Sequence, residues 1–193
     1  MSRQGIQLGL VGTNGSGKSS ASAYLVEKGF VWLSLSDVVR EEVTRKELPE
    51  SRETLIATAN QLKADHGQDF LARRAFAIAA ELRHPRVVFD SIRNVAEVQY
   101  LVGHGVHMIG IDAPTELRFS RICARKRTGD DLDFVTFKRL DDQENHGQSS
   151  GQNIYAAMAA CQEHLTNNGE LTHFLAALDR IIDNVEGLLY AKT

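Results

Sequence analysis

The sequence predicts an α/β fold in which a five-stranded parallel sheet lies between two layers of helices. Short apolar runs rich in β-branched residues recur along the chain, and each is followed by a segment whose apolar residues have helical spacing. A strand followed by a helix, repeated, is typical of a parallel sheet with crossover helices. The 193 residues are 42% hydrophobic, enough for one sizeable core, so we expect a single domain over residues 1–193.

The expected strands are short and mostly apolar. Four are expected at residues 6–11, 30–35, 86–90 and 106–112, and a weaker, more polar candidate lies at 162–166. The third and fourth runs contain the unbroken apolar stretches VVF and MIGI, which suit strands that are buried on both faces. We therefore expect helices to cover both sides of the sheet.

The segment between the second and third strands is long for a single crossover. Apolar residues keep helical spacing over 55–62 and again over 71–82, which predicts two helices there. We interpret residues 38–84 as a helical insertion. The most strongly periodic segment runs from Leu171 to Leu188 and is expected to be a helix that packs on the core.

Composition and charge exclude several classes of protein. The formal net charge of -3 argues against a nucleic-acid polymer as the main partner, so we expect small-molecule partners. Because the sequence has no signal-peptide pattern and no apolar run long enough to span a bilayer, we expect a cytoplasmic protein without a membrane partner. Cys123 and Cys161 lie in helical-looking segments without metal-ligand spacing, and we expect both to be buried thiols.

A glycine-rich loop, GTNGSGKS, directly follows the first expected strand. It matches the phosphate-binding pattern of Gly, four residues, Gly, Lys and Ser, in which glycines let successive backbone N–H groups point at a phosphate. Lys18 adds a positive charge, Ser19 offers a hydroxyl to Mg²⁺, and the helix that follows favours an anion at its start. The residues expected to bind the nucleotide phosphates are Gly12, Thr13, Asn14, Gly15, Ser16, Gly17, Lys18, Ser19 and Ser20.

This loop makes the expected fold that of a P-loop NTPase, a three-layer αβα sandwich, but it does not choose among GTPases, motor-type ATPases and small-molecule kinases. The stretch SLSDVVREEV bears on that choice. A carboxylate such as Asp37 near a helix start caps free N–H groups, and an arginine one turn later, Arg40, can donate two hydrogen bonds to a phosphate. A simple N-cap for Asp37 and a solvated surface charge for Arg40 are the alternatives.

At this stretch the sequence resembles the adenylate-kinase-like group of nucleoside and nucleotide kinases. The resemblance implies that Asp37 and Arg40 lie on the side that binds the phosphate acceptor. It extends over most of the chain and is closest to small P-loop kinase-like domains that occur alone in microbes or ahead of deoxycytidylate deaminases. The stretches SLSDVVREE, ANQLKADHGQDFLARR and DSIRN carry it.

The third strand ends in VVFDSIRN, which puts Asp90 at its carboxyl end. Ligands collect at that edge of open α/β sheets, so Asp90 is expected to hold Mg²⁺, directly or through water. Arg93 matches the second acceptor-phosphate arginine of the resembled family, although Ser91 and Ile92 stand where its turn has Gly and Pro. A structural ion pair is the alternative for Arg93.

The stretch DAPTELRFSRICARKRTGDD follows the fourth strand and places three arginines, Arg118, Arg121 and Arg125, on one helix face. Like charges there repel one another unless an anion or nearby acids neutralise them, and a solvated basic face is the alternative. The resemblance implies that Arg121 and Arg125 stabilise charge on the moving phosphoryl group. It also implies a short lid at about 126–147, from which Arg139 could reach in.

In the resembled family a loop after the fifth strand forms part of the adenine rim, mostly through backbone contacts, and TNNG, with Asn168, stands at that place. Read without the family, it is a turn before a helix. With ATP and Mg²⁺ bound, the resemblance implies that Lys18, Arg121 and Arg125 transfer the γ-phosphoryl group of ATP to a small-molecule acceptor.

The favoured acceptor is a nucleoside monophosphate, and in particular a deoxynucleotide, because two acceptor-side arginines suit a phosphate and a phosphate needs no general base. Dephospho-coenzyme A is the second choice. Its ribose hydroxyl would need a base, for which Asp37 is the candidate. An ATP-binding regulatory module that does not transfer phosphate, and simple NTP hydrolysis, also stay open.

Overall fold

The computed structural model of this chain describes residues 5–125, 132–147 and 152–190, and it confirms the predicted fold class. A single parallel sheet runs through the molecule in the strand order β2-β3-β1-β4-β5. Its strands are β1 (Ile6–Gly12), β2 (Val31–Ser34), β3 (Arg86–Asp90), β4 (His107–Asp112) and β5 (Glu163–Thr166). All five expected strands are present, including the polar fifth one.

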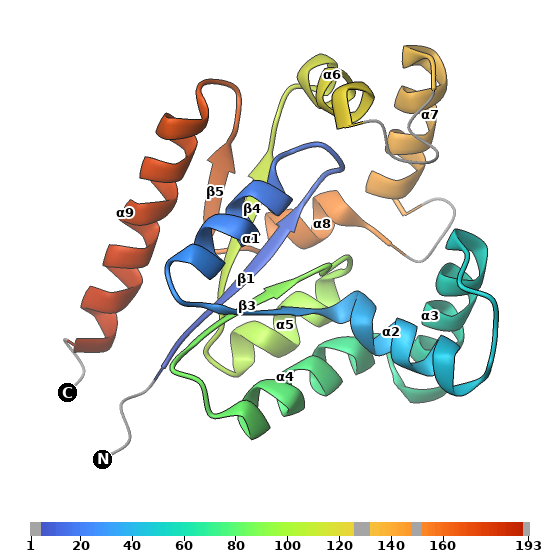
Figure 1. The fold of residues 1–193 in the computed structure, drawn as a ribbon, viewed down its shortest axis with the longest axis horizontal. Helices are drawn as coiled ribbons and strands as arrows, with labels where there is room; N and C mark the ends of the chain where they lie inside the picture. The colour runs from blue at the N-terminus through green and yellow to red at the C-terminus, as the bar shows by residue number, and fades with distance from the viewer. Residues whose placement is uncertain (1–4, 126–131, 148–151, 191–193) are drawn as a thin grey trace.

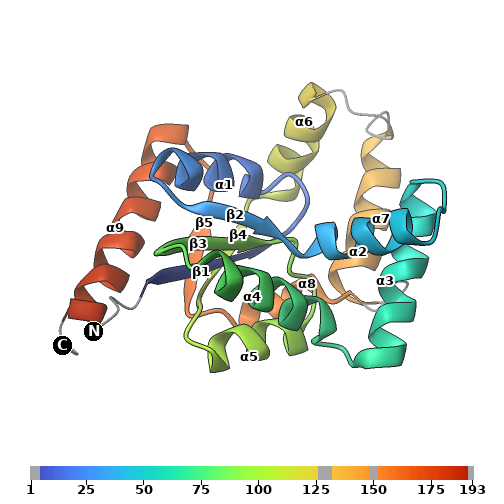
Figure 2. The ribbon, with the colours of Figure 1, turned by 60° about the horizontal axis from the view of Figure 1, so that its bottom comes forward.

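Helices cover both faces of the sheet (Figures 1 and 2). On one face lie α1 (Lys18–Glu27) and α9 (Leu171–Tyr190), and on the other lie α4 (Phe70–Leu82), α5 (Val95–Gly103) and α8 (Ile154–Ala159). The remaining helices are α2 (Leu35–Arg45), α3 (Arg52–His66), α6 (Thr115–Arg125) and α7 (Phe134–Asn145). The two helices expected over 55–62 and 71–82 are therefore confirmed as α3 and α4.

The sheet has a separate hydrophobic core on each face. Val87 and Phe89 pack with α2, α4 and α5 on one side, and Val88 between them packs with α1 and α9 on the other. This alternation follows from the period of two residues in a strand. All three side chains are fully buried, which confirms the expectation for the VVF run. Burying each such side chain contributes about 1.5–3 kcal/mol to folding.

The last helix packs on the core through its middle. Phe174, Leu178 and Ile181 are buried against α1 and the sheet, as the periodicity predicts. Leu171 and Leu188, near the two ends of the helix, are 54% and 59% exposed. The core-packing segment is therefore shorter than the apolar pattern.

The structure differs from the sequence analysis at the start of one helix and at both thiols. The helix after β2 begins at Leu35, one residue inside the expected strand, and Ser34 is its N-cap, since its hydroxyl accepts from the Ser36 N–H. Asp37 lies in the first turn and is not the cap. Cys123, expected to be buried, is exposed on α6, whereas Cys161 is buried but follows α8 rather than lying within a helix.

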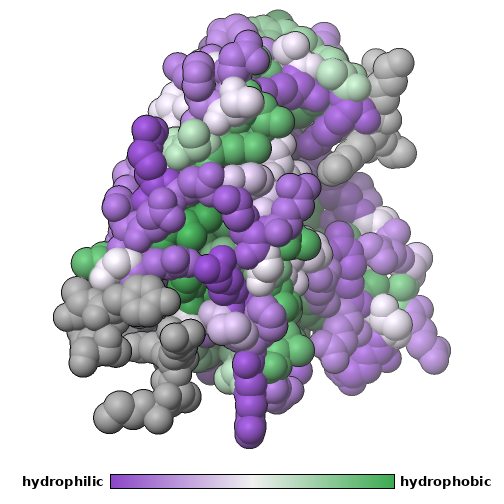
Figure 3. All heavy atoms as spheres, turned by 60° about the vertical axis from the view of Figure 1, so that its left-hand side comes forward, coloured by the Kyte–Doolittle hydropathy of each residue, from purple (hydrophilic) through white to green (hydrophobic). Residues whose placement is uncertain are grey.

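The strand order positions the site. β1 lies between β3 and β4, so the segments that follow these strands diverge at the carboxyl edge of the sheet and leave a crevice there. Figure 3 shows a face of the molecule on which apolar patches are interrupted by hydrophilic side chains. No helix in the described part of the chain is both long and apolar enough to cross a membrane.

Candidate active site

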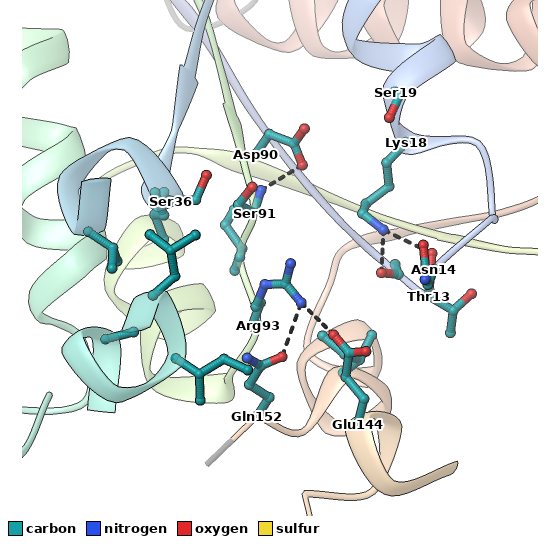
Figure 4. A pocket seen from close by; sticks show the side chains of 18 of the residues that line it. Thr13, Asn14, Lys18, Ser19, Ser36, Asp90, Ser91, Arg93, Glu144 and Gln152 are labelled. Carbon is teal, nitrogen blue, oxygen red and sulfur yellow. Dashed lines mark hydrogen bonds and ion pairs between the residues drawn. The ribbon is translucent and has the colours of Figure 1, made fainter. Parts of the chain in front are cut away.

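A cavity of about 940 Å³ opens at the carboxyl edge of the sheet. The phosphate loop forms one wall, and the opposite wall comes from α2, α3, the end of β3 and the end of α7. Figure 4 shows Lys18 and Arg93 approaching this space from these two walls. Both sets of residues expected to act on phosphates therefore contribute to one cavity.

The loop has the backbone geometry that its glycines allow. Gly15 and Gly17 have φ values of 80° and 107°, in the left-handed region that disfavours other residues. A Cβ on Gly17 would lie 2.3 Å from Asn167 Nδ2, and one on Gly15 would lie 2.7 Å from the Arg118 carbonyl oxygen. Both glycines are therefore required by conformation and by space.

Lys18 is folded back over the loop. Its Nζ donates to the carbonyl oxygens of Gly12 at 2.5 Å and Thr13 at 2.9 Å. Burial of the ammonium lowers the pKa of Lys18 to about 8, although the nearby Asp90 and Glu144 carboxylates act in the opposite direction. A cation with a lowered pKa beside the phosphate loop is suited to bind an anion, which favours its charged form.

The side chains of Thr13 and Ser16 are enclosed. The Thr13 hydroxyl donates to Asp112 Oδ1 at 2.6 Å, which ties the loop to the end of β4. Ser16 is fully buried, and its Oγ has no hydrogen-bond partner among the described residues. Of the residues expected at the nucleotide phosphates, the cavity is lined by Gly12, Thr13, Asn14, Gly15, Gly17, Lys18, Ser19 and Ser20.

The cavity also contains the two side chains that were expected to hold Mg²⁺, Ser19 and Asp90. Asp90 accepts hydrogen bonds from the Ser91 N–H at 2.6 Å, Ser22 Oγ at 3.2 Å and Trp32 Nε1 at 3.3 Å. The described residues contain no cluster of three or more His, Cys, Asp or Glu that could enclose a metal. One carboxylate and one hydroxyl nevertheless fit Mg²⁺, which keeps waters and takes further oxygens from substrate phosphates.

The turn after β3 is strained at Ser91, which has a φ of 63° where the resembled family has glycine. Its hydroxyl accepts a hydrogen bond from Ser34 Oγ at 2.8 Å, which helps to hold the turn. Arg93 lines the cavity, and its Nη1 donates to Glu144 Oε1 at 2.6 Å and Gln152 Oε1 at 3.0 Å. The ion pair that was the alternative for Arg93 is therefore present, and it lies inside the cavity.

Arg40 lines the same cavity, but Asp37 does not. Arg40 donates to Ser36 Oγ at 2.7 Å and forms ion pairs with Asp37 and Glu50, both at 3.1 Å. The Asp37 side chain lines a separate pocket of about 260 Å³ that also involves Ala75 on α4. The structure therefore does not bring Asp37 to the place of a general base in the main cavity.

The three arginines of α6 have different environments. Arg118 is 1% exposed and its guanidinium forms two hydrogen bonds with the Asp141 carboxylate, at 2.6 and 2.7 Å. Burial alone would lower the pKa of Arg118, but the bonds to Asp141 raise it. Arg118 also donates to the Asn14 carbonyl oxygen at 3.2 Å. Asp141 therefore neutralises Arg118, and Arg118 joins α7 to the phosphate loop.

Arg121 and Arg125 line the cavity on the loop side. Arg121 donates to the Gly15 carbonyl oxygen at 3.4 Å and to the carbonyl oxygen of Asn167 at 3.1 Å. Arg125 donates to Asn14 Oδ1 at 3.4 Å. Both guanidinium groups therefore contact the phosphate loop.

Asn167 is a site residue that the sequence did not reveal. It is 5% exposed, and its Nδ2 donates to the Ser16 carbonyl oxygen at 2.9 Å, so it fixes the loop from the end of β5. Asn168, the expected residue of the adenine rim, is exposed and does not line the cavity. The signal that could have identified Asn167 was the TNNG stretch, in which it directly precedes Asn168.

The expected lid is only partly described. Residues 126–131 lie outside the described residues, and the rest of the segment forms α7 and its end at Gly147. Arg139 is exposed on α7, where it donates to Gln143 Oε1 at 3.5 Å. Arg139 therefore does not line the cavity in this structure.

The sheet order, the phosphate loop and the cavity between two cationic walls define a P-loop kinase-like domain. The chain belongs to the family AAA_18, described as an AAA domain, whose model matches residues 8–147. It is 31% identical over 180 residues to a UPF0200 protein of Methanosarcina barkeri, covering 92% of this chain and 94% of the relative. A UPF0200 protein of Methanoregula boonei is 32% identical over 181 residues, with 93% and 97% covered.

Solved structures support the same fold. The structure of TT1252 from Thermus thermophilus has a TM-score of 0.61 at 20% identity, covering 94% of this chain and 98% of that one. Shikimate kinase from Bacteroides thetaiotaomicron has a TM-score of 0.58 at 11% identity, with the same coverage. At these identities the likeness concerns the fold, and it agrees with the resemblance to P-loop kinases.

Proposed function

We propose that this protein transfers the γ-phosphoryl group of MgATP to a nucleoside monophosphate. The observation that carries the proposal is the single cavity between the phosphate loop and a second cationic wall containing Arg40 and Arg93. Phosphoryl transfer needs two bound phosphates, a metal ion and cations around the moving group. A deoxynucleotide is the acceptor that we favour, on the resemblance to domains found ahead of deoxycytidylate deaminases.

On the donor side, Lys18 exchanges its two carbonyl partners for the oxygens of the β- and γ-phosphates, and the loop N–H groups hold the same phosphates. Ser19 and Asp90 would hold the metal ion. Bound Mg²⁺ would neutralise charge on the phosphates during transfer. Arg121 and Arg125 turn from the loop toward the moving phosphoryl group and stabilise its charge.

On the acceptor side, Arg40 and Arg93 bind the phosphate of the monophosphate. Both are now paired with carboxylates, Arg40 with Glu50 and Arg93 with Glu144, and a phosphate presents similar oxygens in greater number. A phosphate acceptor arrives ionised and needs no general base. The position of Asp37 outside the cavity supports this acceptor over the ribose hydroxyl of dephospho-coenzyme A.

The first experiment is a transfer assay with MgATP and each ribo- and deoxynucleoside monophosphate, with dephospho-coenzyme A and a sample without acceptor alongside. Formation of one nucleoside diphosphate supports the proposal and identifies the acceptor. Binding of MgATP without any product would indicate a regulatory module. Release of phosphate at the same rate in the sample without acceptor would indicate simple hydrolysis.

Arg40→Ala tests the assignment of the acceptor wall. Losing a charge-assisted hydrogen bond costs about 1.5–3 kcal/mol, so the acceptor KM should rise about 10- to 150-fold while the ATP KM stays nearly constant. Arg45→Ala, on the same helix and paired with Glu42, is the matched control. A change in the ATP KM alone would contradict the assignment.

A further inference from the structure

A buried ion pair lies in the wall of the cavity on the acceptor side. Lys63 on α3 and Glu97 on α5 are 6% and 1% exposed, with 3.5 Å between Lys63 Nζ and Glu97 Oε1. Both residues line the cavity. None of the roles proposed above involves this ion pair.

Lys63 interrupts an apolar helix face. Leu55, Ala59 and Leu62 have the spacing of one face of α3, and Leu55 and Ala59 line the cavity together with Leu71 of α4. A lysine that continues this face has to be desolvated, and a buried ion pair is a weak source of stability compared with apolar packing. The contribution of Lys63 to folding therefore does not explain a lysine at this position, and a function in binding does.

Glu97 already has a structural role, but that role does not require its charge. Its Oε2 accepts hydrogen bonds from the N–H groups of Arg93 at 2.8 Å and Asn94 at 3.2 Å, and Asn94 Oδ1 accepts from the Glu97 N–H. This is a capping box, in which glutamine serves as well as glutamate. The carboxylate is needed because it faces Lys63.

The contact with Glu97 leaves Lys63 with hydrogen-bonding capacity. An ammonium group has three N–H donors, and 3.5 Å is the long end of the range for a hydrogen bond. A ligand oxygen or nitrogen that enters beside Leu55, Ala59 and Leu71 can therefore accept from Lys63. Such a ligand offers an apolar face and a polar edge, which is the chemistry of a nucleobase.

We propose that Lys63, held in place by Glu97, is a specificity-determining residue that donates a hydrogen bond to a carbonyl oxygen or ring nitrogen of the acceptor's base. The inference rests on the proposed function, because it takes the acceptor to be a nucleotide. The base packs on the apolar side chains of α3 and α4, and its phosphate lies at Arg40 and Arg93. A polyol would place hydroxyl groups against that apolar wall and would bind poorly.

The test compares binding of the preferred nucleoside monophosphate with binding of ribose 5-phosphate, which has the phosphate but no base. Titration calorimetry measures both in the presence of a non-hydrolysable ATP analogue and Mg²⁺. In the double variant K63M/E97Q the charges are removed together and the cap is kept. We expect the preference for the nucleotide to fall about tenfold or more, while the affinity for ribose 5-phosphate changes less than about twofold.

The unmodified protein gives a second test that does not depend on a variant. A nucleotide analogue whose base has carbon in place of the hydrogen-bond acceptors should bind about tenfold more weakly than its parent. Equal binding of analogue and parent would overturn the inference. So would an unchanged preference in a folded double variant, or a wild-type protein that binds nucleotides no better than ribose 5-phosphate.

Failure of the proposed transfer has a different signature. In that case the wild-type protein forms no product with any acceptor, while the binding preference and its loss in K63M/E97Q are still observed.

Discussion

Arg93 Nη1 lies 2.6 Å from Glu144 Oε1, so the turn after β3 is joined to α7 within the acceptor wall of the cavity. The same carboxylate lies 3.8 Å from Arg52 at the start of α3. Glu144 therefore contacts cations from two other elements that line the acceptor wall. An acceptor phosphate would have to compete with this carboxylate for Arg93.

Glu144→Gln should strengthen acceptor binding. The amide keeps a hydrogen-bond acceptor for Arg93 but removes the negative charge, so we expect the acceptor KM to fall several-fold, with the ATP KM nearly unchanged. Steady-state kinetics with the preferred acceptor measure both values. Asp142→Asn, at an exposed position on the same helix, is the matched control and should leave both constants as they are. A raised acceptor KM in Glu144→Gln would show that the carboxylate assists binding.

Binding of MgATP should weaken above pH 8. The pKa of Lys18 is lowered to about 8 by burial, so the ligand-free protein loses the Lys18 proton at that pH, whereas a triphosphate favours the charged form. Binding then takes up a proton, and the affinity falls by up to about tenfold per pH unit until the pKa of the complex is passed. Calorimetric titration between pH 7 and 10 measures this.

The Lys18→Met variant is the control for this pH dependence. It should bind MgATP more weakly at pH 7 and show no decline that begins near pH 8. The ligand-free wild-type protein should become more stable between pH 8 and 10.5, because its folded-state pKa lies below the ordinary value of 10.5. An affinity for MgATP that is constant over pH 7–10 would refute the proposed contact with Lys18.

Asn167→Ala should impair ATP binding, whereas Asn168→Ala should not. The first change leaves the buried Ser16 carbonyl oxygen without its donor and frees the loop, a cost of about 1–3 kcal/mol or roughly 5- to 150-fold in affinity. The Asn168 side chain is exposed, so its removal should change affinity less than about twofold. Equal effects of the two substitutions would argue against Asn167 as the support of the loop.

Arg118→Met should destabilise the whole fold. It leaves the Asp141 carboxylate buried without its partner, which costs about 3–5 kcal/mol. Urea unfolding measures the loss, and the double variant Arg118→Met/Asp141→Leu should recover most of it, because the unpaired charge is gone. Arg139→Met, at an exposed position of α7, should stay within about 0.5 kcal/mol of wild type. A double variant as unstable as the single one would mean that the ion pair itself holds α7.

The sheet and one half of the site could be predicted from the sequence because the signals are local. The GTNGSGKS loop follows directly from its glycine spacing, Asp90 follows from its position after a buried strand, and the resemblance at DSIRN adds Arg93. In a parallel sheet the carboxyl ends of the strands meet at one edge, so local motifs become neighbours without further information. The cavity that Lys18, Asp90 and Arg93 share is a consequence of this topology.

The acid partners could not be predicted, since they depend on how helices pack. Asp141 and Glu144 lie on α7, which has no motif, and only the packing of that helix brings them to Arg118 and Arg93. The role of Asn167 as a support of the phosphate loop could not be predicted for a similar reason. Neighbouring residues after a strand point to opposite sides, so the pattern TNNG does not tell which asparagine faces the loop.

Cys123 was misjudged because the buried side of α6 is occupied by Arg118 and Ile122. One residue further along a helix is a rotation of about 100°, which turns Cys123 to the solvent. Its small apolar side chain gave no sign of this.

The contrast between the two thiols makes the natural chain suitable for site-selective chemistry. Burial raises the pKa of Cys161 to about 12, so this thiol stays protonated and enclosed at neutral pH, while Cys123 is open to solvent. A maleimide fluorophore should therefore attach at one position without any engineered cysteine. That position lies between Arg121 and Arg125, where the emission of the dye can follow the arginine helix as nucleotides bind.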